Sequence, residues 1–228
     1  MEQIKVFMVG DSTMTNYEAD VAPRAGWGQV FNTYFEPNIS ILNAASSGRS
    51  SKSFIDEKKL EKIASEIGEN DYLFIQFGHN DQKTDEERHT EPFTTYKSYL
   101  SQYINTAIEK QAIPILITPV QRRSCGVNGK LHDTHGEYPI AMKELAEECN
   151  VLLIDLGSKS KSLLENIGPE KSKQLYLWYN PSEEPNYPEG VQDDTHFSLV
   201  GAHLIARLIV DELKTMNLSL SSSIKDKW

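Results

Sequence analysis

Residues 4–12 read Ile-Lys-Val-Phe-Met-Val-Gly-Asp-Ser, an apolar run that ends in a glycine, a carboxylate and a hydroxyl. Two later apolar runs end in a similar way: Ile39–Leu42 is followed by Gly48, and Tyr72–Phe77 by Gly-His-Asn-Asp at 78–81. Apolar runs of this length are typical of strands covered on both faces of a parallel sheet. Because the carboxyl ends of such strands meet at one edge, where ligands bind, we expect these motifs to lie close together.

Two further runs, Ile113–Thr118 and Val151–Leu156, have the same apolar character. The segments between the runs carry apolar residues at helical spacing, and they are Ser53–Ile67, Phe93–Lys110, Pro139–Cys149 and Ser198–Met216. This alternation predicts a single doubly wound α/β domain, with a five-stranded parallel sheet and helices on both faces. In the flavodoxin-like strand order 2-1-3-4-5, Ser12 is flanked by Gly48 on one side and Asn80 on the other.

The predicted domain covers residues 1–218. The polar, serine-rich residues 219–228 are expected to form a frayed tail. Two long stretches without clear periodicity, Gln121–Gly136 and Gly168–Asp194, are expected to be irregular segments that wall a cleft at the sheet edge.

Composition narrows the class of protein. Of the 228 residues, 39% are hydrophobic and 25% charged, an ordinary globular mixture, and the net charge of −10 argues against nucleic acid or an anionic membrane as partner. Met1 leads into the first apolar run without a signal-peptide pattern, and no apolar run is long enough to cross a bilayer, so we expect a soluble cytoplasmic protein. Cys125 and Cys149 match neither a metal-binding spacing nor a disulfide framework.

A catalytic interpretation centres on Ser12 and on the run Asp-Asp-Thr-His at 193–196. A serine hydroxyl becomes a nucleophile when a nearby imidazole takes its proton, which assigns His196 as the base. Asp193, three residues earlier, lies on the same side of a loop that leads into the last helix, and we prefer it to Asp194 as the partner of His196. The alternative is that Ser12 and the 193–198 stretch only cap helices.

The same motifs contain hydrogen-bond donors for a reaction at an ester. Attack on an ester carbonyl places negative charge on its oxygen, and preorganised N–H groups lower that barrier. The backbone amides of Ser12 and Gly48 and the side-chain amide of Asn80 are the candidate donors. A plain turn at Gly48 and an Asx-turn at Asn80 are the alternatives.

Taken together, Gly10-Asp11-Ser12, Gly48, the 78–81 run and the 193–196 run resemble the four signature blocks of the SGNH (GDSL-type) hydrolase superfamily. The 77–81 and 194–197 stretches are most similar to rhamnogalacturonan acetylesterases. This resemblance implies a flavodoxin-like fold without a metal or organic cofactor, and removal of acetyl groups from pectin backbone sugars. It assigns Ser12 as nucleophile, Asp193 and His196 as its triad partners, and Gly48 and Asn80 to the oxyanion hole. Without the secretion signal of fungal members, imported oligosaccharides are the favoured substrates.

Some side chains near the predicted cleft are candidates for binding the sugar. A guanidinium pairs well with a galacturonate carboxylate, and Arg49, next to Gly48, is the first candidate among Arg24, Arg49, Lys83, Arg122 and Arg123. His79 is a further candidate. Trp178, Tyr179 and Tyr187 precede the 193–196 run, where they either stack on sugar rings or pack the loop onto the core. The run His-Asp-Thr-His at 132–135 lacks a third strong ligand nearby, so no metal site is predicted.

The sequence therefore predicts a serine esterase that removes O-acetyl groups from pectin-derived oligosaccharides through an acyl-enzyme. Three alternatives remain at this point: a lipase or thioesterase with the same machinery, an acetylxylan-type esterase, and a catalytically silent carbohydrate-binding module. Composition carries no signal about the oligomeric state.

Overall fold

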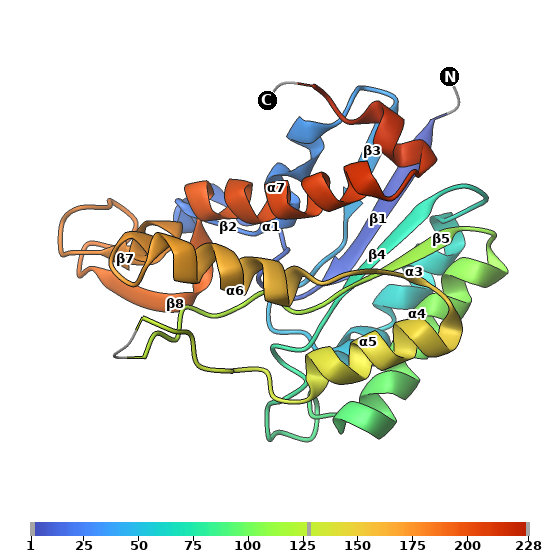
Figure 1. Cartoon of the computed structure of the whole chain (residues 1–228), viewed down its shortest axis with the longest axis horizontal. Helices are drawn as coiled ribbons and strands as arrows, with labels where there is room; N and C mark the ends of the chain where they lie inside the picture. The colour runs from blue at the N-terminus through green and yellow to red at the C-terminus, as the bar shows by residue number, and fades with distance from the viewer. Residues whose placement is uncertain (1–2, 127–128, 227–228) are drawn as a thin grey trace.

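The computed structural model describes residues 3–126 and 129–226, and at its centre lies a parallel sheet of five strands (Figure 1). The strands are β1 (Ile4–Gly10), β3 (Ile39–Asn43), β4 (Tyr72–Gln76), β5 (Ile113–Ile117) and β6 (Leu152–Ile154). Their order is β3-β1-β4-β5-β6, which confirms the predicted α/β fold and its strand order. Along β1, Val6 and Met8 face one apolar core while Phe7 and Val9 face the other, which explains why the strand is apolar from Val6 to Val9.

Helices cover both faces of this sheet (Figure 1). One face is covered by α1 (Trp27–Val30), α6 (Leu156–Ile167) and α7 (Leu199–Thr215), and the other by α2 (Ser51–Asp56), α3 (Lys59–Glu66), α4 (Lys97–Glu109) and α5 (Tyr138–Cys149). Short 3-10 helices are η1 (Ala19–Val21), η2 (Phe31–Tyr34), η4 (Lys171–Leu175) and η5 (Ser219–Ser223), and a π-helical turn, η3 (Pro92–Tyr96), precedes α4. None of the helices in the described residues is long and apolar enough to span a membrane.

Two helical segments differ from the sequence expectation. The Ser53–Ile67 segment is two helices, because Lys58 adopts a left-handed conformation with φ of 59° between α2 and α3. The Val151–Leu156 run is strand only as far as Ile154. Asp155 then caps α6 by accepting a hydrogen bond from the Ser158 amide, and this helix was not predicted.

A second, antiparallel sheet has the order β2-β8-β7 and packs at one end of the molecule (Figure 1). Its strands are β2 (Arg24–Ala25), β7 (Tyr176–Tyr179) and β8 (Val191–Ser198). The expectation that 168–194 is irregular is therefore wrong for 171–179 and 191–194, whereas 180–190 form a loop. The expectation that His196 lies on a loop is also wrong, because His196 belongs to β8. Tyr176 pairs with Phe197 and Leu177 with Asp193, so residues 194–196 form a bulge that redirects the side chains.

The polar C-terminal segment packs against the domain. In η5, Leu220 is fully buried, and Ile224 forms a β-bridge with Phe35. The hydroxyl groups of Tyr72 and Ser219 lie 2.8 Å apart. The expectation of a frayed tail is thus wrong for residues 219–226, and residues 227–228 lie outside the described part.

A buried carboxyl group joins the end of β4 to the start of α2. Asp81 is fully buried, and its Oδ1 accepts hydrogen bonds from the Ser51 amide (3.1 Å), the Ser51 hydroxyl and the Thr90 hydroxyl (3.2 Å). Burial raises the pKa of Asp81 to about 7, although the hydrogen bonds from Ser51 and Thr90 act in the opposite direction. This contact fixes the loop after β3 against the loop after β4.

The raised pKa of Asp81 predicts a dependence of stability on pH. The folded chain holds this proton up to about pH 7, whereas an unfolded aspartate releases it near pH 4. The contribution of this proton to the free energy of unfolding is therefore complete below about pH 4 and is lost as pH rises to about 7. The loss is on the order of a few kcal/mol. Urea unfolding of wild type and Asp81→Asn from pH 4 to 8 should show wild type losing stability relative to the variant. The same pH dependence of unfolding free energy in wild type and Asp81→Asn would contradict the raised pKa of Asp81. Glu61→Gln, on the exposed side of α3, is the control.

Candidate active site

Ser12 lies just beyond the end of β1, where the chain makes a tight turn. The turn is held by Asp11, whose Oδ1 accepts hydrogen bonds from the Thr13 amide (2.9 Å) and the Thr13 hydroxyl (2.8 Å). The Ser12 hydroxyl instead lies 3.0 Å from Nε2 of His196, and no helix begins at this turn. The geometry therefore does not support a helix-capping role for Ser12.

Asp193, His196 and Ser12 form a continuous hydrogen-bonded chain. Nδ1 of His196 lies 2.6 Å from Oδ2 of Asp193, and Oδ1 of Asp193 accepts bonds from the amides of Thr195 (2.7 Å) and His196 (3.0 Å). Burial raises the pKa of Asp193, but the contacts with His196 and Thr195 outweigh it and lower the pKa to about 2. An ionised Asp193 holds the proton on Nδ1, so Nε2 is left to accept a proton from Ser12.

The predicted donors to an oxyanion come from three neighbouring segments. The Ser46 amide donates to Gly10 O (2.9 Å), and the Asn80 side-chain amide donates to Arg49 O (2.9 Å), so the loop after β3 is bound to both neighbouring strand ends. Gly48 has a φ of +80°, a conformation that favours glycine. Within the described residues, the backbone amides of Ser12 and Gly48 donate to no protein group.

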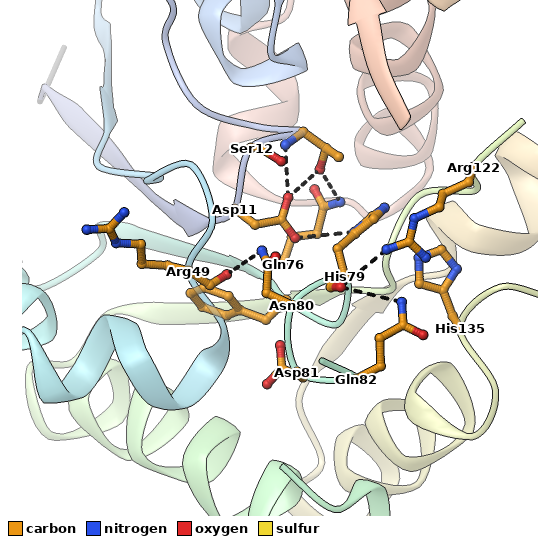
Figure 2. Close-up of polar contacts among 12 residues, drawn as sticks. Asp11, Ser12, Arg49, Gln76, His79, Asn80, Asp81, Gln82, Arg122 and His135 are labelled. Atoms are coloured by element: carbon orange, nitrogen blue, oxygen red, sulfur yellow. Dashed lines mark hydrogen bonds and ion pairs between the residues drawn. The ribbon is translucent and has the colours of Figure 1, made fainter. Parts of the chain in front are cut away.

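Beneath Ser12 lies a buried pair of ionisable groups, Asp11 and His79 (Figure 2). Nδ1 of His79 is 3.2 Å from Oδ2 of Asp11, and the His135 ring meets the His79 ring edge-on at 4.5 Å. Burial lowers the pKa of His79. Burial raises the pKa of Asp11, but His79 and Thr13 outweigh it and leave the pKa below its ordinary value. His79 is only 3% exposed, so it supports the Ser12 turn from below, and the expectation that it contacts a substrate directly is not supported.

This buried layer continues through residues that the sequence analysis did not single out. The indole of Trp27 donates to Gln76 Oε1 (2.6 Å), and Gln76 donates to the Thr13 hydroxyl (3.3 Å), which in turn donates to Asp11. Gln76 interrupts the otherwise apolar Tyr72–Phe77 run. This polar residue within a predicted buried strand is the sequence signal that could have identified the buried layer. A polar side chain that is fully buried in a strand needs a partner there.

Two of the side chains expected to bind sugar have other partners. The guanidinium of Arg49 pairs with Glu57 (2.9 Å) and points away from Ser12 (Figure 2). Trp178 donates its indole N–H to Asp194 (2.8 Å), and the cations of Arg123 and Lys173 lie 4.9 and 4.8 Å from its ring centre. These contacts favour the packing alternative for Trp178.

The same contacts separate Asp194 from the hydrogen-bonded chain of Asp193, His196 and Ser12. Its Oδ1 accepts a bond from Arg123 (2.7 Å) as well as from Trp178, whereas Asp193 faces His196. Asp194 therefore anchors β8 to β7 and to the segment after β5.

The described residues contain no group of three or more His, Cys, Asp and Glu side chains placed to hold a metal ion. In the 132–135 run, the His135 ring lies against His79, and Asp133 accepts hydrogen bonds from the amides of His135 and Gly136. Cys125 and Cys149 are free thiols.

Comparison with known proteins agrees with this geometry. A family model described as GDSL-like lipase/acylhydrolase matches residues 6–209. The chain is 46% identical over 221 residues to the rhamnogalacturonan acetylesterase RhgT of Bacillus subtilis, which covers 97% of this chain and 94% of that protein. It is 43% identical to the probable rhamnogalacturonan acetylesterase YesY of the same organism, over 96% of each.

Among solved structures, the YxiM protein of Bacillus subtilis aligns with a TM-score of 0.82 at 29% identity, over 96% of this chain and 58% of that chain. A family model that spans most of the chain and relatives above 40% identity confirm the resemblance carried by the four motifs. The chain belongs to the GDSL-like lipase/acylhydrolase family.

Proposed function

We propose that this protein is a serine esterase that removes O-acetyl groups from pectin-derived, rhamnogalacturonan-like oligosaccharides. The hydrogen-bonded chain from Asp193 through His196 to Ser12 carries the proposal, with heavy-atom distances of 2.6 and 3.0 Å. These distances meet the requirement for a nucleophile, a base and an orienting group within hydrogen-bond reach.

In the first half of the reaction, Ser12 Oγ attacks the acetyl carbonyl carbon while its proton moves to Nε2 of His196. The imidazolium that forms is stabilised by the ionised Asp193. Collapse of the tetrahedral intermediate breaks the bond to the sugar oxygen, which leaves with the proton from His196. The acetyl group is then an ester of Ser12.

In the second half, water takes the place of the sugar hydroxyl. His196 accepts a proton from the water as it attacks the acetyl-serine carbonyl, and then returns the proton to Ser12 Oγ as acetate leaves. In both halves the negative charge on the carbonyl oxygen faces the amides of Ser12 and Gly48 and the side chain of Asn80. Each such donor is worth about 3–4 kcal/mol of transition-state stabilisation.

The substrate class rests on the relatives. RhgT and YesY, at 46% and 43% identity over nearly the whole chain, are named for activity on acetylated rhamnogalacturonan. Acetate release from acetylated rhamnogalacturonan oligosaccharides, acetylated xylo-oligosaccharides and an aryl acetate tests this directly. Preference for the first substrate supports the proposal. Equal or higher activity on the xylo-oligosaccharides would assign the enzyme to the acetylxylan alternative.

Replacing the nucleophile tests the mechanism. Ser12→Ala should lower acetate release by about 10⁶-fold, because it removes the hydroxyl that forms the acyl-enzyme. The thermal midpoint should change little, since among the described residues the Ser12 hydroxyl has a hydrogen-bond partner only in His196. Ser65→Ala, an exposed serine on α3, is the matched control. Turnover by a purified Ser12→Ala preparation at more than a small fraction of the wild-type rate would refute a Ser12 acyl-enzyme.

The two adjacent carboxylates provide a second test. Asp193→Asn should lower kcat by about 10⁴-fold, because an amide no longer fixes the imidazole tautomer or stabilises its charged form. Asp194→Asn should reduce kcat less than tenfold. It should instead lower the urea midpoint, because it leaves the buried Arg123 without its anion. Equal losses of kcat in the two variants would show that Asp193 is not the orienting residue.

A further inference from the structure

Two of the six arginines, Arg24 and Arg122, form no ion pair with any described residue, and they differ in their other contacts. Four of the six arginines pair with carboxylates: Arg49 with Glu57, Arg88 with Asp85, Arg123 with Asp194 and Arg207 with Asp211. The Arg122 guanidinium donates to the backbone carbonyls of Thr134 (3.0 Å) and His79 (3.2 Å). Arg24 forms no ion pair with any described residue, although the chain carries a net charge of −10.

The Arg24 guanidinium is held in place and partly removed from water. It lies over the ring of Tyr17, with its central carbon 4.4 Å from the ring centre. Its Nε is buried and has no hydrogen-bond acceptor among the described residues. A half-buried cation without a counter-ion is costly, and an anion that reaches its terminal nitrogens would relieve that cost.

Tyr17 connects this cation to the nucleophile. The Tyr17 hydroxyl donates to the backbone carbonyl of Ser12 (2.8 Å). On the other side, Arg24 belongs to β2, which pairs with β8 through Ser198 and Phe197, next to His196. Arg24 therefore comes from the strand next to the one that carries His196, and its guanidinium packs on the tyrosine that contacts the Ser12 backbone.

The segment before Arg24 is braced by the loop between β7 and β8. Asn186 donates to the carbonyls of Ala19 (3.0 Å) and Ala22 (2.8 Å), and the Tyr187 hydroxyl donates to Val21 O (2.9 Å). Burial raises the pKa of Tyr187, in keeping with its packing against this segment. These contacts preorganise the position of Arg24.

We propose that Arg24 binds the carboxylate of a uronic acid residue in the bound oligosaccharide. The proposal rests on the proposed function for the identity of the substrate. A guanidinium presents paired N–H donors that match the two oxygens of a carboxylate, and a neutral sugar cannot satisfy them in this way. Arg24, and not Arg49, is then the residue that selects for a charged sugar.

The test measures inhibition of aryl acetate hydrolysis by an unacetylated rhamnogalacturonan oligosaccharide and by its carboxyl-reduced, uncharged form. Wild type should bind the charged form about tenfold more tightly, in line with one charge-assisted hydrogen-bonded pair. Arg24→Gln should bring the ratio of the two inhibition constants close to one, and Arg24→Lys should retain part of it. Arg207→Gln, which removes a paired arginine on α7, should leave the ratio as in wild type.

The outcomes separate this proposal from the proposed function. A preference for the charged form that persists in Arg24→Gln, or equal weakening of both inhibitors, would overturn the role of Arg24. A wild-type enzyme that does not distinguish the two inhibitors would overturn it as well. Acetate release from the acetylated oligosaccharide is measured separately. Its absence, with charge-dependent inhibition intact, would refute the acetylesterase activity on that substrate while the carboxylate site stands.

Discussion

The candidate site depends on the register in which β1 pairs with its two neighbours. Gly10, the last residue of β1, lies opposite Gln76 of β4, so the segments after the two strands leave the sheet at the same level. Ser12 and Asn80 are then neighbours across the strand ends, and the loop after β3 closes the third side. A slip of one residue would turn the apolar side chains of β1 to the wrong cores and separate the two motifs at once. The same strand register is therefore required both for packing the core and for aligning the groups of the candidate site.

This alignment has an electrostatic cost, which the layer below Ser12 offsets. Asp11 is fully buried beside the nucleophile, where an unpaired carboxylate is unfavourable. Two donors from Thr13 and the ring of His79 surround it, and Gln76 and Trp27 extend the layer into the core. Because each member has a fixed partner, the turn that presents Ser12 has little freedom to relax, which is the preorganisation that catalysis requires.

The part of the fold that sequence reasoning predicted is the part governed by apolar patterning. The five strands and their order follow from buried runs, and Ser12, Gly48 and Asn80 follow the strand ends. The second sheet was missed because β8 is polar through Asp193 to His196 and has no apolar alternation. The sequence offered both Arg24 and Arg49 as candidates for binding a carboxylate, but it could not rank them correctly. Whether an arginine is neutralised depends on which carboxylate the fold brings to it, and Glu57 reaches Arg49 only because the chain turns between α2 and α3.

The two sheets contribute different residues to the candidate site, and this division bears on substrate specificity. The parallel sheet supplies Ser12 and the oxyanion donors, whose positions are set by core packing. The antiparallel sheet supplies His196 and Asp193 from β8 and also holds Arg24 on β2, so one small sheet connects the proposed base to the cation. The loop between β7 and β8 contacts the segment before Arg24 through Asn186 and Tyr187. On the proposed roles of Arg24 and Ser12, the preference for a charged over a neutral glycan therefore depends on a different sheet from the one that carries the nucleophile.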